Sequence, residues 1–312
     1  MKRSVMALVA AVGAAVLALA MMPNAAAKPD TTAAAIERDR FGVQEIYPTK
    51  AGGREWSLPA DATKSDSEWG GGSHVKKTGE KDVFRVSGSP RIPVASPAGK
   101  AWWRNVEITA YYRLQGTLSG DGPAPGYQLY ARGERHVTSN PAASSVNRGV
   151  RAPAGTATWP GYPFSGNING HCLGSSYKGY VDRDGEMHFK KEISHTKGYT
   201  GSRDKKKPFA GGLPTNKWFG FKTVIRNINN NKAVQMENWL DRNADGRWVK
   251  INTVTDSGGW TGGAGLDGCT AAPFRFKQDQ IITWAGPYVN FRFDRLNTDL
   301  RWLSAREIDP LP

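Results

Sequence analysis

Cysteine is scarce in this chain, which has only two in 312 residues, and apolar runs and helical periodicity are scarce as well. Neither cysteine belongs to a Cys-x-x-Cys pair, which argues against a metal module held by cysteine. After residue 27 no stretch is apolar enough to cross a membrane, so the sequence predicts no membrane span in the mature chain. It also lacks a phosphate-binding loop, a nucleophile elbow and a His-Glu-x-x-His motif, so the corresponding enzymes are not expected.

The N-terminus has the pattern of a secretory signal peptide. Lys2 and Arg3 precede an apolar run from Val5 to Met22, and small residues follow up to Ala27. A basic start, an apolar middle and an Ala-x-Ala end predict a signal peptide over residues 1–27, with a retained membrane anchor as the alternative. We therefore expect a secreted protein, extracellular or in the cell envelope. Residues 28–40 are predicted to be a flexible lead, and 41–312 a single domain.

The two cysteines, Cys172 and Cys269, both follow the predicted signal peptide. In an oxidising compartment an even pair predicts a disulfide, which would join two long glycine-rich loops. Two free thiols, or a metal site, are the alternatives.

The formal charge of +14 predicts attraction to a polyanion. Outside the cell the abundant polyanions are acidic polysaccharides, teichoic acids and anionic lipids, so an acidic polysaccharide is the expected partner and nucleic acid is not. A basic surface that only keeps the protein soluble is the alternative. The sequence leaves the oligomeric state open.

Alternation of apolar and polar residues predicts β-strands along most of the chain. The segments with this pattern include 106–114, 127–136, 177–193, 217–228, 232–240 and 247–251, and turns are predicted at 184–185, 229–231 and 245–246. Thirty-six glycines and nineteen prolines supply further turns. These features predict an all-β fold, an antiparallel β-sandwich of the jelly-roll type.

Two segments resemble a known family. "KWFGFKTVIRNINNNKAVQMENWLDRNADGRWVKI" and, later, "LSAREIDP" are similar to the C-terminal half of secreted concanavalin A-like jelly rolls, which include enzymes of the alginate/glucuronan lyase-like class. The resemblance extends over about 103–310. It implies a curved sheet with a polar, aromatic groove that holds a sugar chain, and β-elimination of an acidic polysaccharide as the activity.

A polysaccharide lyase needs a group that neutralises the uronic carboxylate, a base and an acid. Arginine suits the first role and Arg132 is the candidate. His136 or His195 suits the base, and Tyr177 or Tyr199 the acid. Further candidates for binding the substrate are Lys190, Lys191, Glu192, Trp218, Lys222, Glu237 and Trp239; of these, the three lysines would attract the polyanion and the two tryptophans would stack on sugar rings.

Two other functions remain open at this stage. A carbohydrate-binding protein would use the same face without cleaving a bond. A glycoside hydrolase would need two carboxylates facing one bond, which Glu237 with Glu192 or Glu107 would supply if their strands were aligned. Lys190, Lys191 and Glu192 also fit a merely solvated strand edge.

No cofactor is expected, with one weak exception. Asp241, Asn243 and Asp245 have the spacing of the start of a calcium loop, but residue 252 is asparagine where such a loop carries its bidentate glutamate. A hairpin turn at Asp245-Gly246 is the favoured alternative.

Overall fold

The computed structural model describes residues 37–95, 103–132, 175–194, 198–262, 266, 269–271, 275–286 and 288–312. These residues form fourteen strands and contain no α-helix. The strands are β1 (Glu55–Ser57), β2 (Val75–Lys77), β3 (Phe84–Gly88), β4 (Arg91–Ala95), β5 (Val106–Thr117), β6 (Gly126–Ala131), β7 (Ser176–Asp182), β8 (Met187–Glu192), β9 (Arg203–Lys206), β10 (Trp218–Ile228), β11 (Ala233–Asp241), β12 (Val249–Asp256), β13 (Tyr288–Asp294) and β14 (Leu296–Glu307).

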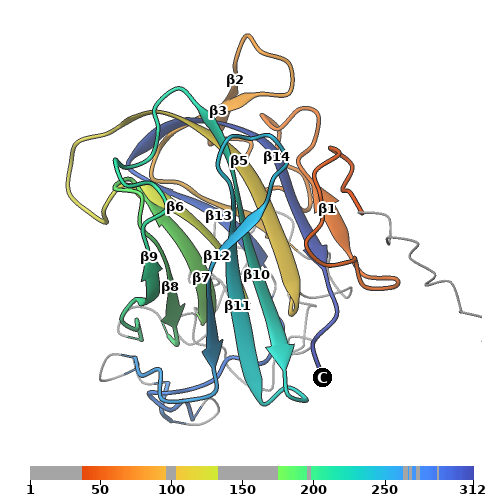
Figure 1. Cartoon of the computed structure of the whole chain (residues 1–312), viewed down its shortest axis with the longest axis vertical. Coiled ribbons are helices and arrows are strands. Elements are labelled where there is room, and N and C mark those ends of the chain that lie inside the picture. The colour runs from red at the N-terminus through yellow and green to blue at the C-terminus, as the bar shows by residue number, and fades with distance from the viewer. Residues whose placement is uncertain are drawn as a thin grey trace, which may run out of the picture. The chain divides into compact units, whose positions relative to one another are not determined.

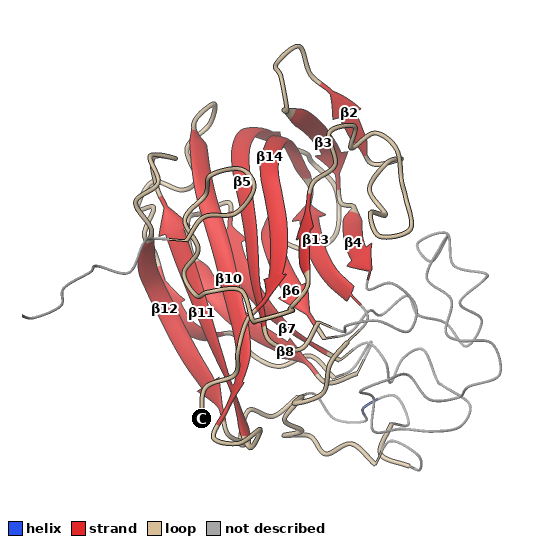
Figure 2. Cartoon of the chain, turned by 90° about the vertical axis from the view of Figure 1, so that its right-hand side faces the viewer, coloured by secondary structure: helices blue, strands red, loops and turns tan. Residues whose placement is uncertain are grey.

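The strands form two sheets that face each other (Figures 1 and 2). An eight-stranded sheet has the order β12-β11-β10-β5-β14-β3-β2, with β1 also paired to β14. A six-stranded sheet has the order β4-β13-β6-β7-β8-β9. Every pairing between these strands is antiparallel. The predicted fold class, an all-β antiparallel sandwich of the jelly-roll type, is confirmed.

The core lies between the sheets, because each long strand turns its apolar alternate residues to that side. In the eight-stranded sheet Ile108 and Phe221 are fully buried, as the alternation predicts, and in the six-stranded sheet Leu129 is fully buried too. Tyr112 of β5 and Tyr127 of β6 stack across the interface, with ring centroids 4.1 Å apart. Offset aromatic stacking adds to the free energy gained from burying the two rings.

The three predicted turns are confirmed. Gly185 has a φ of 89° between β7 and β8, and Gly246 has a φ of 84° between β11 and β12, values that a glycine adopts without strain. Asn229, Asn230 and Asn231 also have positive φ between β10 and β11. Asparagine is among the residues that tolerate this region.

The end of the predicted flexible lead differs from expectation. Residues 28–36 lie outside the described part of the chain, and of residues 37–40 only Asp39 is buried. Asp39 is buried and its Oδ2 accepts a hydrogen bond from Ser304 Oγ at 2.9 Å. The packed domain therefore includes residues that the sequence assigns to the lead.

A buried ion network attaches this N-terminal segment to the outer face of the eight-stranded sheet. The carboxylate of Glu107 lies 2.7 Å from Lys222 Nζ and 3.0 Å from Arg306 Nη2. It also accepts hydrogen bonds from the backbone N–H groups of Ile46 and Tyr47. Burial alone would raise the pKa of Glu107, but Lys222 and Arg306 hold it below its ordinary value.

Replacing Glu107 by alanine should lower the free energy of unfolding by about 3–5 kcal/mol, because the buried Lys222 loses its carboxylate partner and Arg306 keeps only Glu45. The measurement is denaturant unfolding. Glu80→Ala, which removes a more exposed partner of Arg113, is the control and should cost less than about 1 kcal/mol. A group whose pKa is depressed by folding stabilises above its unfolded pKa, so this contribution should disappear as the pH falls through the folded pKa. Equal losses for the two variants at neutral pH would contradict the prediction.

Candidate functional site

The residues predicted to form one substrate site divide between the two outer faces of the sandwich. Lys222 and Glu237 alternate with core residues of the eight-stranded sheet and point away from the core. Lys190 and Glu192 lie on the outer face of the six-stranded sheet. The expectation of a single groove that contains both sets is therefore wrong. Alternation identified the outward residues of each strand, but not which sheet each strand joins.

On the outer face of the eight-stranded sheet, the charged side chains form ion pairs and hydrogen bonds with one another. Glu237 accepts hydrogen bonds from Tyr47 Oη and Trp239 Nε1, each at 2.9 Å. Lys222 is 1% exposed and bonded to Glu107, so the expectation that it attracts a polyanion is wrong. The hydrolase pair of Glu237 with Glu192 is also wrong, since these two carboxylates lie on opposite faces. Glu107 and Glu237, the other pair, are both bound to cations.

Trp218 and Trp239 are half-buried on the same outer face, on adjacent strands as expected. Trp239 pairs with Lys222, four residues along β10 from Trp218, so the two rings do not lie side by side. Arg301 stacks over Trp218 with its guanidinium carbon 4.3 Å from the ring centroid. Trp218 lines a small pocket of about 560 Å³.

The calcium candidate is a turn, as the alternative interpretation held. The carboxylate of Asp241 accepts hydrogen bonds from the N–H groups of Asp245 and Gly246 and from Tyr111 Oη, all within 3.0 Å. Asn243 and Asp245 are exposed on the turn. The lone pairs of Asp241 that a calcium ion would need are thus occupied by the hairpin itself.

Three of the predicted site residues form a buried cluster on the inner side and at the end of the six-stranded sheet. Tyr177, Lys191 and Arg132 are fully buried. Asp256 accepts hydrogen bonds from Tyr177 Oη at 2.6 Å and from Lys191 Nζ at 2.8 Å. Arg132 donates to the carbonyl of Arg104 and lies over the Tyr177 ring. Lys191 was expected to attract a polyanion, and its burial makes that expectation wrong.

Strand β6 ends earlier than the sequence predicts. It ends at Ala131, and Arg132 has a φ of 79°. Arg132 therefore leaves the outward row that Gln128 and Tyr130 begin. His136 and His195, the predicted bases, lie outside the described residues.

Of the two cysteines predicted to form a disulfide, only Cys269 is among the described residues. Cys269 is fully buried, and the described part of the chain contains no free cysteine. Cys172 lies outside the described residues, so its pairing with Cys269 remains a prediction.

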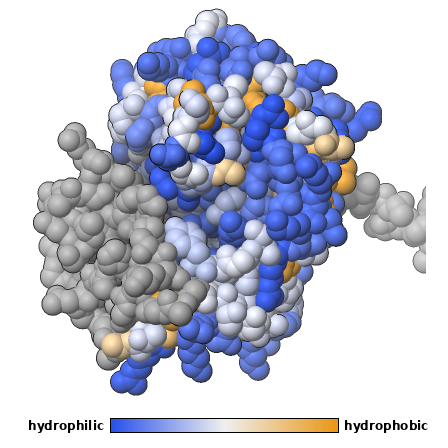
Figure 3. All heavy atoms as spheres, turned by 90° about the vertical axis from the view of Figure 1, so that its left-hand side faces the viewer, coloured by the Kyte–Doolittle hydropathy of each residue, from blue (hydrophilic) through white to orange (hydrophobic). Residues whose placement is uncertain are grey.

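The outer face of the six-stranded sheet carries the strongest candidate site, which we call the polar face. Its register places Arg292, Gln128, Tyr180 and His188 in one row across β13, β6, β7 and β8, and Asn290, Tyr130, Lys178 and Lys190 in the next. On the side of the molecule where β8 and β9 lie, the surface that described residues form is mainly hydrophilic (Figure 3). The polar face consists of Arg91, Gln128, Tyr130, Lys178, Tyr180, His188, Lys190, Glu192, Tyr199, Asn290 and Arg292.

Lys178 lies near the middle of the polar face. Its ammonium group pairs with Glu192 and lies 5.0 Å from the ring centroid of Tyr130 and 5.1 Å from that of Tyr199. Burial lowers the pKa of Lys178, and Glu192 opposes this effect. The site therefore holds an ammonium between two aromatic rings.

Amide groups supply unpaired donors and acceptors beside this ammonium. Gln128 Nε2 donates to Asp294 at 2.6 Å, whereas Gln128 Oε1 has no hydrogen-bond partner in the described structure. Asn290 is fully buried, and within the described ranges neither its Nδ2 nor its Oδ1 is hydrogen-bonded. Buried amides are almost always paired, so an unpaired one marks a position where a ligand or water supplies the bonds.

At the end of the polar face near His188, the pKa values of His188 and Asp182 differ from their ordinary values. Burial, with the nearby charge of Lys190, lowers the pKa of His188 to about 4. Burial and the neighbouring carboxylate of Asp184 raise the pKa of Asp182 to about 7. His188 is therefore neutral at physiological pH.

Sequence reasoning had found Lys190, Glu192 and Tyr199 of this face but not Lys178, Tyr180, Asn290 or Arg292. The signal was present, because alternation in "SYKGYVD" places Lys178 and Tyr180 opposite the core residue Tyr177. In "YVNFRFD" it likewise places Asn290 and Arg292 opposite Phe291. Of the two tyrosines predicted as the acid, Tyr177 lies on the core side.

Comparison with known proteins gives no family assignment. No family model matches the sequence, and no curated protein matches it. Similar solved structures include arcelin-5, a lectin-like defence protein from Phaseolus vulgaris (7% identity, TM-score 0.38, 83% of this chain and 100% of that one). Others are the calcium-bound exoplasmic/lumenal domain of VIP36 (10%, 0.41, 81% and 90%) and peanut lectin (11%, 0.36, 82% and 97%). At these TM-scores the likeness carries no inference about ligand or activity.

The search for membrane-spanning helices found none among the described residues.

Lys191→Met should lower the free energy of unfolding by about 3–5 kcal/mol, because Asp256 would keep a buried charge without its cation. Lys190→Met, one residue earlier on the outward side, is the matched control and should cost less than about 1 kcal/mol. Denaturant unfolding of the two variants measures the difference. A small loss for Lys191→Met would show that Asp256 does not depend on this ion pair.

Proposed function

We propose that this protein binds an acidic polysaccharide on its polar face. The observation that carries the proposal is the buried, unpaired amide of Asn290, which lies in one row with Tyr130 and Lys178. An amide offers two donors and an acceptor, which match the hydroxyl groups of a sugar. A few convergent polar groups among aromatic rings are typical of small-molecule and carbohydrate sites.

The acidic character of the polymer is inferred from the cations of the polar face. Lys190 on β8 and Arg91 on β4 are the less buried cations of this face, whereas Lys178 and Arg292 are buried and paired with Glu192 and Asp294. Lys190 is half-buried over the ring of Tyr180 and makes no ion pair with a described residue. A uronic carboxylate would supply the missing anion, and the overall charge of +14 would speed its approach.

Binding is tested by titrating alginate, glucuronan, pectate and hyaluronan, with neutral dextran for comparison. We expect at least one acidic polymer to bind, more weakly as salt is added. Lys190→Met should weaken binding at least about 10-fold, since a hydrogen bond to a charged group is worth about 1.5–3 kcal/mol. Asn290→Ala should weaken it about 2–10-fold, since each lost hydrogen bond to a hydroxyl group is worth about 0.5–1.5 kcal/mol. Lys217→Met, an exposed lysine beside the eight-stranded sheet, is the charge-matched control. Equal weakening by Lys217→Met, or no retained polymer, would contradict the proposal.

Elimination chemistry on the same face is a second candidate function. The observation that favours it is the half-buried Tyr199, whose ring lies 5.1 Å from the Lys178 ammonium. In β-elimination the ionised phenol of a tyrosine beside a cation would take the proton next to the carboxylate and return it to the leaving oxygen as the C–O bond breaks, while a cation stabilises the carboxylate as it becomes enolate-like.

Ultraviolet absorbance during incubation with each acidic polymer separates the two functions, because elimination creates an unsaturated product. If the protein is a lyase, Tyr199→Phe should reduce the rate at least about 100-fold while the polymer still binds. Binding with a flat trace for the unmodified protein would rule out the lyase and leave the binding function standing.

A further inference from the structure

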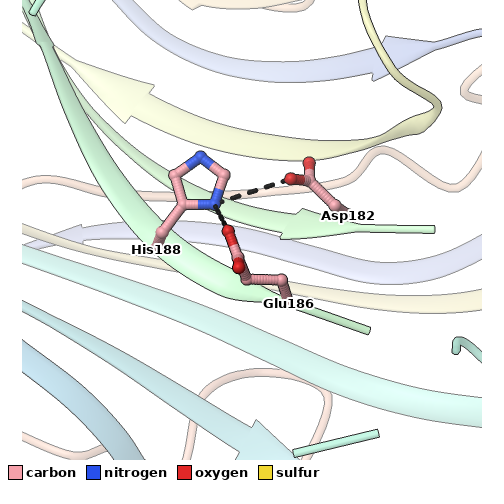
Figure 4. Close-up of side chains that lie close together, drawn as sticks. All are labelled: Asp182, Glu186 and His188. Carbon is pink, nitrogen blue, oxygen red and sulfur yellow. Dashed lines mark ion pairs between the residues drawn. The ribbon is translucent and has the colours of Figure 1, made fainter. Parts of the chain in front are cut away.

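Three potential metal ligands meet at the β7–β8 hairpin, at the end of the polar face (Figure 4). Asp182 is the last residue of β7, Glu186 immediately precedes β8, and His188 is the second residue of β8. The turn at Asp184-Gly185 places Asp182 N within hydrogen-bond distance of Glu186 O, at 2.8 Å. The three side chains therefore lie on one side of the sheet because of strand alternation and the hairpin register.

His188 points between the two carboxylates, and nothing within the described ranges hydrogen-bonds to it. It is 3% exposed, and neither Nδ1 nor Nε2 has a hydrogen-bond partner there. Its Nδ1 lies 3.4 Å from Glu186 Oε1 and 3.5 Å from Asp182 Oδ2, beyond ordinary hydrogen-bond length. The ring of Tyr180 stacks on the imidazole at 4.6 Å and holds it in this orientation.

These separations have the dimensions of a metal chelate. With zinc–nitrogen and zinc–oxygen bonds of about 2.0–2.2 Å and tetrahedral angles, two ligand atoms lie about 3.4 Å apart. Both distances from His188 Nδ1 agree with this value. The ligand atoms all lie within 4.8 Å of one another, so the carboxylates need only a small rotation to enclose an ion.

We propose that Asp182, Glu186 and His188 bind a divalent transition-metal ion of the zinc type. An imidazole with two carboxylates suits zinc or cobalt, whereas calcium takes six to eight oxygen ligands. Three protein ligands leave a fourth position for water or for an oxygen of a bound molecule. The site shares His188 with the polar face, but the proposal does not rest on carbohydrate binding.

The surroundings of the site include a route for an ion from solvent and a cation, Lys205, that competes for Glu186. A surface pocket of about 720 Å³, lined by Asp182 and Glu186 among others, gives an ion a route from solvent. Lys205 Nζ lies 2.9 Å from Glu186 Oε1 and is 57% exposed, so its side chain is free to turn away when a metal binds. Lys205 thus competes with the ion for Glu186.

The test uses full-length mature protein without a histidine tag. Cobalt(II) is titrated and its visible absorption is recorded, because tetrahedral cobalt has intense ligand-field bands, and zinc is then added to displace it. We expect one cobalt ion per chain, displaced by zinc and not by calcium. His188→Gln should weaken cobalt binding by more than about 100-fold, beyond the 10–100-fold that a supporting residue of a metal site typically costs. Asp182→Asn should weaken it too.

Two further variants keep the proposal falsifiable. His74→Gln replaces an exposed histidine and should leave the titration unchanged. Lys205→Met removes the competing cation and should tighten binding, an effect that misfolding does not produce. Thermal unfolding should shift upward with zinc in the unmodified protein and not in His188→Gln. The absence of tetrahedral bands, equal binding by His188→Gln, or weaker binding by Lys205→Met would overturn the proposal.

Discussion

The structure depends on one constraint, which is that two antiparallel sheets must bury one face each against the other. Every long strand then presents alternate side chains to a shared core, where Tyr112 and Tyr127 stack across the interface. The remaining side chains go to the two outer faces. The chain is basic, and many of its charged side chains lie on these outer faces. The two outer faces therefore differ in chemistry from the apolar core.

The two outer faces use their charges in different ways. On the eight-stranded sheet Glu107, Lys222 and Arg306 satisfy one another and hold the N-terminal segment by its backbone N–H groups. On the six-stranded sheet Lys178 is paired, but the amide of Asn290 is not hydrogen-bonded to any residue that the structure describes. Burial without a partner costs free energy, so unpaired groups favour the six-stranded face as the one that receives a ligand. Charges that pair with one another and hold the N-terminal segment favour a structural role for the other face.

The β7–β8 hairpin belongs to both proposed sites. Its register produces a row of the polar face and also the cluster of Asp182, Glu186 and His188. The stack of Tyr180 on His188 joins the two sites physically. An ion at the cluster would fix the imidazole and, through it, one ring of the polar face. Metal content and polysaccharide affinity are therefore properties to be measured on the same preparation.

The sequence by itself determined most of the long strands, the three turns and the outward side of those strands, because alternation and turn residues act over a few neighbouring positions. It therefore identified Lys190, Glu192 and the outward position of Lys222. Only the tertiary structure decided that Lys222 and Glu192 lie on opposite sides of the molecule, that Lys191 is bound to Asp256, and that Asn290 of β13 lies beside Tyr130 of β6. Sheet membership depends on which strands pair across more than a hundred residues of chain, and no local pattern records that choice.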